Sequence, residues 1–194
     1  MTSLRRFILA FICAAMLGVT VPSGAFAQSK VPKTAVLDMR AVLRDSVAGK
    51  TWQDYYNAKR KEHKDRIAAE EKNVRAAWDE LNRQRSILAP QAFQVRERAF
   101  RDLETAARGR VGVAEQQLAR ELRATQAEVR KIMDAKLEVI LEEMIKERGI
   151  DIIIAKDDLV FSRKEFDLTA EVMKRLNAAL PKLDIAALAA KAKK

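Results

Sequence analysis

A single stretch of helix-favouring sequence, from about Arg40 to Arg148, constrains this chain more than any other feature. It is dense in Glu, Lys, Arg, Ala and Leu, and it contains only one proline, Pro90, near its middle. Because this stretch exceeds the length of an ordinary globular helix, we predict that it folds back near Pro90 as a hairpin of two arms. At ~1.5 Å per residue, arms over 40–88 and 91–148 would extend ~74 Å and ~87 Å. Such arms would reach far beyond a body built from the remaining residues.

Apolar residues recur every seven positions in both predicted arms, a pattern typical of a coiled coil. In the outgoing arm the series comprises Ile67, Val74, Leu81 and Leu88. In the returning arm it comprises Val111, Leu118, Thr125, Ile132 and Val139. Seams this narrow are enough to join two helices, but they are too narrow to make the hairpin the core of a globule.

The returning arm changes register near its middle. One apolar series ends at Ala107 and the next begins at Val111, and a step of four residues locally unwinds a supercoil. Gly109 and Gly112 lie at the same point, and each costs about 1 kcal/mol of helix stability relative to alanine. We therefore predict a weak point where the arm can bend. The alternative is a pair of glycines tolerated within a long helix.

The first 27 residues have the pattern of a cleavable signal peptide. Arg5–Arg6 form a basic start, Phe7–Val19 is an apolar run, and Ala25–Ala27 supply a small-x-small cleavage site. The apolar run is shorter than the ~20 residues that span a bilayer, so we expect export of the chain without a membrane anchor. Cleavage at this site would remove Cys13, the only cysteine, and would leave no disulfide or thiol chemistry.

The predicted fold class is α+β, in which a long antiparallel coiled-coil hairpin is attached to a small β-rich oligomerisation body. The predicted domains are a signal peptide (1–27), a body (28–49 and 149–180), a hairpin arm (50–148, with its tip near 86–92) and a flexible C-terminal tail (181–194). Short strands are predicted at 34–38, 151–155 and 159–162, and the last two are expected to form a hairpin that turns at Asp157 and Asp158. A helix over 167–180, capped by Thr169 or Asp167, is expected to end at Pro181.

A body of this size is marginal on its own, because domains of about 70 residues bury little core without disulfides or metals. Its strands would also leave unpaired edges that favour pairing with other chains. We therefore expect a multimer whose body is assembled from several chains. The side chains predicted to form the interface are Val36, Leu37, Ile152, Ile153, Ile154, Val160 and Phe161.

The chain is basic, with a formal net charge of +10. An arginine cluster lies on the distal part of the arm and comprises Arg83, Arg85, Arg96, Arg98, Arg101, Arg108 and Arg110. The plain interpretation of any one of these residues is a solvated helix face. A cluster near the end of an arm would also attract acidic partners over roughly the Debye length, ~8 Å at physiological salt. The candidates are unfolded acidic proteins, lipopolysaccharide and anionic lipid head groups, whereas an exported protein is not expected to meet nucleic acid.

Three aromatic residues on the distal arm allow two interpretations. Trp78, Phe93 and Phe100 could hold the hairpin together or could contact an apolar client, and the sequence does not separate these roles. Catalysis has no visible machinery, since the chain has no phosphate-binding glycine loop, Ser/His/Asp arrangement or prominent carboxylate pair. His63 is the only histidine, so no metal or cofactor is predicted.

The chain resembles the Skp (OmpH-like) periplasmic chaperones of Gram-negative bacteria across nearly its whole mature length. The residues that carry the resemblance are Ala35–Met39, Val42–Leu43, Ser46, Ala48–Lys50, Leu88–Pro90, Phe166–Thr169, Val172, Leu176 and Asn177. Their order and spacing, together with the signal peptide, make the resemblance persuasive. The extension after Leu180 departs from the compact ending expected of the family.

The resemblance implies a jellyfish-like homotrimer, in which a β-rich body joins three chains and three helical arms enclose a cavity. Such proteins hold unfolded outer membrane proteins in solution without ATP and pass them to the outer membrane, and some are described as binding lipopolysaccharide. A rival interpretation is a coiled-coil scaffold or adaptor of the cell envelope, although such adaptors usually carry larger β-domains. A second rival, a nucleic-acid binder, rests on charge alone.

Overall fold

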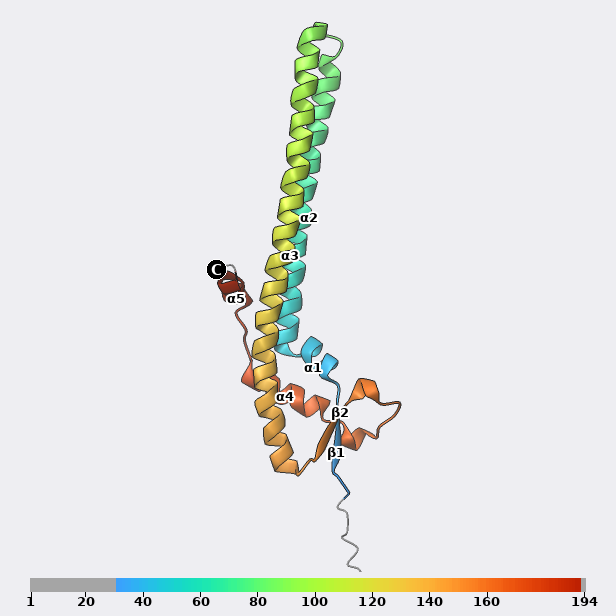
Figure 1. Ribbon diagram of the computed structural model, residues 1–194, viewed down its shortest axis with the longest axis vertical. Helices are drawn as coiled ribbons and strands as arrows, with labels where there is room; N and C mark the ends of the chain where they lie inside the picture. Colours follow the sequence, from blue (N-terminus) through green and yellow to red (C-terminus); the bar gives the residue numbers. More distant parts are fainter. Residues whose placement is uncertain (1–30, 193–194) are drawn as a thin grey trace, which may run out of the picture. The chain divides into compact units, whose positions relative to one another are not determined.

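The computed structural model describes residues 31–192, all but Val31 within the compact unit Pro32–Lys194. The predicted signal peptide and Cys13 lie outside the described residues. In chain order the elements are β1 (Thr34–Leu37), α1 (Met39–Asp45), α2 (Val47–Gln84), α3 (Pro90–Arg148), β2 (Ile152–Ala155), the 3-10 helices η1 (Lys156–Asp158) and η2 (Lys164–Phe166), α4 (Thr169–Ala179) and α5 (Ile185–Ala192) (Figure 1).

The predicted helical hairpin is confirmed. Helices α2 and α3 run antiparallel beside each other and are joined by the turn 85–89 (Figure 1). Pro90 is the first residue of α3, where its missing N–H costs nothing and its fixed φ fits the helix. At the other end Gly149 stops α3 in the left-handed conformation, with a φ of 62°, which glycine adopts without strain. Local sequence signals therefore set both ends of the longer helix.

The outgoing helix is interrupted near its start, where the sequence predicts an unbroken helix. Ser46 is extended, with a ψ of 161°, and separates α1 from α2. Its buried hydroxyl accepts a hydrogen bond from the Gly49 N–H at 3.2 Å, so Ser46 is the N-cap of α2. The Asn177 side chain of α4 accepts the Val47 N–H at 2.8 Å. Hydrogen bonds accepted by Ser46 and by Asn177 of α4 thus fix the break between α1 and α2.

The predicted strand hairpin of 151–155 with 159–162 is wrong. β2 pairs with β1 in parallel, with Thr34 opposite Ile152 and Leu37 opposite Ala155, while 159–162 forms no strand. The antiparallel helices return the chain to its starting point, so β1 becomes available as a partner for β2. On the other side of β1, the Leu168 N–H donates to the Val36 carbonyl at 2.9 Å.

One apolar core joins this small sheet to the base of the arm. Val42 of α1, Met144 of α3 and Leu176 of α4 have no exposed surface and belong to a single cluster. The C-terminal part of α3 belongs to this cluster, so it forms part of the body as well as part of the hairpin. Val36 and Leu37 are each only 3 % exposed within one chain, so little of either side chain is left for the predicted subunit interface.

The last two helices differ from their predictions. α4 begins at Thr169 with Leu168 as N-cap, so neither expected cap residue holds that position. The Asp167 carboxylate still accepts the Thr169 N–H at 2.9 Å, and the Thr169 hydroxyl accepts the Asp38 N–H at 2.9 Å. Where the sequence predicts a flexible tail, α5 forms a helix that packs on α3. Its apolar residues pack on α3, a contact that the sequence did not predict.

Candidate client-binding surface of the helical arms

The coiled-coil seam is closed along most of the hairpin. Leu81 of α2 and Ala107 and Leu122 of α3 are buried between the helices. The predicted seam residue Val139, however, is exposed, because the buried series of α3 continues instead through Met133 and Leu137. An undistorted α-helix drifts from a seven-residue repeat, and past the start of α2 the body, rather than α2, covers α3. The seam buries these residues, yet Val95 and Val113 of α3 and Trp78 of α2 remain exposed and available to other partners.

Polar contacts lock the two helices together at two levels. Near the base, the Tyr55 hydroxyl donates to Glu121 Oε1 at 2.8 Å, and Lys59 Nζ lies 3.5 Å from the same atom. Partial burial, together with the Glu121 carboxylate, raises the pKa of Tyr55 to about 12. Further out, Arg110 donates two hydrogen bonds of 2.9 Å to the Glu70 carboxylate. The Arg110 guanidinium lowers the pKa of Glu70.

The seven predicted client-binding arginines fall into three groups. Arg110 bridges the helices. Three others, the paired arginines, contact a glutamate three or four residues away on their own helix; they are Arg83, Arg101 and Arg108. The last three, the tip arginines, are exposed and have no carboxylate at ion-pair distance among the described residues; they are Arg85, Arg96 and Arg98. Arginines without an ion-pair contact therefore gather close to the turn of the hairpin.

The three aromatic residues predicted on the distal arm also differ in their contacts and exposure. The rings of Trp78 on α2 and Phe100 on α3 lie 5.3 Å apart and inclined at 46°, so this pair joins the two helices. Trp78 nevertheless remains 48 % exposed, while Phe93 is half-buried nearer the turn. Packing and client contact are thus compatible for Trp78.

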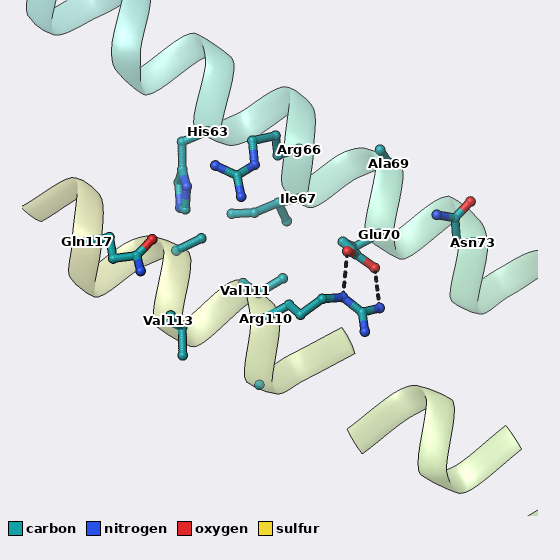
Figure 2. A pocket seen from close by; sticks show the side chains of 12 residues that line it. His63, Arg66, Ile67, Ala69, Glu70, Asn73, Arg110, Val111, Val113 and Gln117 are labelled. Atoms are coloured by element: carbon teal, nitrogen blue, oxygen red, sulfur yellow. Dashed lines mark hydrogen bonds and ion pairs between the residues drawn. The ribbon is translucent and has the colours of Figure 1, made fainter. Parts of the chain in front are cut away.

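Two open grooves flank the seam where the register changes. One has a volume of about 580 Å³ and is lined by His63, Glu70, Gly109, Arg110 and Gln117 among others (Figure 2). The other, about 840 Å³, reaches from Gly112 to Trp78 and Phe100. Ile67 and Val111 line both grooves, so the two grooves share part of their lining. A Cβ added at Gly109 or Gly112 would meet nothing within 4 Å.

These grooves were not predicted, although the sequence carried their signal in the four-residue step and the two glycines. They form at the predicted weak point of the arm because small residues there leave the space beside the seam unfilled. His63 lines the first groove and lies near Gln117 (Figure 2). Among residues 31–192, no group of three or more His, Cys, Asp or Glu side chains is placed to hold a metal ion.

The predicted interface residues of the body are unevenly exposed. Ile152 of β2 is 46 % exposed, and Ile153 and Ile154 are half-buried. Val160 and Phe161, in the loop between η1 and η2, are almost fully exposed. Within the described part of the chain β2 pairs only with β1, so its second edge has no strand beside it. No helix of the described region is both long and apolar enough to cross a membrane.

Comparisons with known proteins agree with this architecture. The family model "Outer membrane protein (OmpH-like)" matches residues 33–176. A crystal structure of a candidate outer membrane chaperone (OmpH-like) from Caulobacter crescentus CB15 superposes with a TM-score of 0.67, at 14 % identity, over 79 % of this chain and 89 % of that one. No curated protein matches the sequence. The family match stops before α5.

Proposed function

We propose, from the premise that the chain belongs to the OmpH-like family, that its exported form is an ATP-independent periplasmic holdase chaperone. It binds unfolded outer membrane proteins in a cavity between helical arms, prevents their aggregation and passes them to the outer membrane assembly machinery. The observation that carries this proposal is the hairpin of α2 and α3. Its two helices bury their seam residues against each other, and its outer surfaces remain free to hold a client.

Weak and distributed contacts suit a holdase that works without ATP. The tip arginines supply attraction to acidic segments, and Trp78 with the adjoining groove supplies an apolar surface. A single exposed ion pair contributes only about 0–1 kcal/mol. Several such contacts made by arms that share one body add up through effective concentration, yet each exchanges rapidly. A client held in this way is protected from aggregation and can still leave.

The cavity requires more than one copy of the chain, and we propose a homotrimer joined through the body. Support comes from the exposed Ile152, Val160 and Phe161 and from the open edge of β2. An exposed apolar strand edge favours pairing with another chain. Pairing between subunits would cover these side chains and would place several hairpins around one space. The tip arginines would also suit lipopolysaccharide or an anionic membrane surface.

The decisive experiment follows light scattering while an outer membrane porin is diluted from urea into buffer. The mature chain, residues 28–194, should keep the porin soluble without nucleotide, and sedimentation should show one porin bound to an oligomer of the chain. A soluble protein that refolds rapidly serves as the control and should stay unbound. Aggregation at the same rate with and without the mature chain would refute the proposal. Capture of a single folded partner in fixed stoichiometry would favour the envelope scaffold instead.

A further inference from the structure

Helix α5 covers apolar surface of the arm base. It packs mainly on α3, with a smaller contact to α2 (Figure 1). Ile185 and Ala189 are buried and Leu188 is partly buried, at spacings of three and four residues that place them on one helical face. Ile185 and Leu188 join the apolar cluster that contains the α3 stripe, a row of side chains comprising Val129, Met133 and Leu137.

Only apolar burial holds α5 in this place. Its one side-chain hydrogen bond is internal, from the Ala187 N–H to the Asp184 carboxylate at 2.9 Å. Among the described residues, no ion pair or side-chain hydrogen bond joins α5 to α2 or α3. Apolar burial is non-directional and depends on area rather than on a particular sequence. Any apolar segment of similar size could therefore occupy the same stripe.

The helix is also weak by itself. It has only eight residues, and helices shorter than ~12 residues are marginal in water without packing. Ordering its backbone costs free energy of the same order as the gain from burying two or three side chains. A short connection, 180–184, ties it to α4, so its local concentration at the stripe is roughly millimolar. A free segment must compete with that concentration to bind.

We infer that α5 is a tethered internal competitor, which covers the α3 stripe until an apolar segment of an unfolded client displaces it. This inference rests on the proposed function and names the regulation of client binding at the arm base. α5 itself shows the chemistry of the ligand, a short apolar segment rich in small residues. If α5 is seated about ten times as often as it is displaced, its removal tightens client binding about tenfold.

The test uses Ile185→Glu, which puts a charge on the buried face of α5, and Ala186→Glu, which puts the same charge on the exposed neighbouring position. Binding of a urea-denatured porin to each full mature chain is measured by fluorescence titration. Hydrogen exchange of the α5 amides is followed with and without porin. We expect porin to raise exchange in α5 of the unmodified chain, and Ile185→Glu, but not Ala186→Glu, to tighten binding about tenfold.

A chain that ends at Pro181 provides a second variant, because it lacks α5 altogether and should bind porin as tightly as Ile185→Glu. A synthetic peptide of residues 183–192 added to that chain should weaken porin binding again. The inference is overturned if α5 stays protected in the complex, or if neither variant binds more tightly while the unmodified chain holds porin normally. If the unmodified chain does not hold porin at all, the proposed function itself fails.

Discussion

Gly49 occupies a position where a single methyl group should disrupt the root of the arm. It lies in the first turn of α2, buried against the end of α1. A Cβ at this position would stand 2.7 Å from the Arg44 carbonyl oxygen and 2.9 Å from the Leu43 carbonyl carbon, and it would be closer still to the Leu43 oxygen. Ordinary contacts need about 3.4 Å or more. All three atoms belong to the backbone, so no side chain can move aside.

The cost of Gly49→Ala follows from what must shift. Overpacking typically costs about 1–3 kcal/mol. Moving α1 away from α2 also strains the hydrogen bond from the Gly49 N–H to Ser46, and complete loss of an N-cap costs ~1 kcal/mol. The helix propensity of alanine returns up to ~1 kcal/mol. The net loss of about 1–3 kcal/mol should lower the midpoint of thermal unfolding by about 3–10 °C.

Thermal unfolding by circular dichroism at 222 nm measures this loss, with all chains at one concentration because an oligomer's midpoint depends on it. Gly112→Ala is the matched control, since its Cβ would meet nothing within 4 Å and it lies in an exposed helix interior. That change should raise stability by about 0.4–1 kcal/mol. An unchanged midpoint for Gly49→Ala, or equal losses for both variants, would refute the steric argument.

Three further outcomes are expected. Changing the tip arginines to glutamine should slow porin capture at low salt and reduce its salt dependence, whereas the same change of the paired arginines, with equal loss of charge, should have a smaller effect; equal rates in stopped-flow mixing would contradict this. Phe161→Asp should shift the mature chain to lower mass in analytical ultracentrifugation, while Glu165→Asp in the adjacent, exposed helix η2 should not; an unchanged mass would remove Phe161 from the interface. Burial alone would raise the pKa of Asp167, but hydrogen bonds from Lys156 and Thr169 lower it to about 2. Its folded-state pKa is thus depressed, so its stabilisation is present above pH ~4 and disappears as pH falls towards 2, and Asp167→Asn should flatten acid unfolding in that window when followed by circular dichroism.

The sequence predicted the hairpin because its determinants are local. Pro90 starts α3, Gly149 ends it, and the seven-residue repeats that contain Leu81 and Leu118 need only the two neighbouring helices. The unpaired state of the tip arginines was not predictable, because it depends on which carboxylates lie within reach in space. Arg110 shows this well, since its partner, Glu70, lies forty residues away on the other helix.

The errors concern contacts between distant segments. A turn at Asp157 and Asp158 predicted a local strand pair, yet the hairpin brings β1 to β2 and makes the distant pairing available. Val36 and Leu37 were predicted at a subunit interface because the sequence could not show that both are buried within one chain. The tail, rich in Ala and Lys, was predicted to be flexible, because the sequence could not show that α5 packs on α3.

The parallel register of β1 and β2 has a mechanical consequence. The arm leaves β1 at its carboxyl end, through α1, and enters β2 at its amino end, from α3. The two strands are therefore attached to the hairpin at opposite ends of the sheet, so the hydrogen bonds between β1 and β2 together resist any sliding of α3 past α2 along the hairpin axis. The strand pair thus opposes a shift in register between the two helices at the point where both join the body.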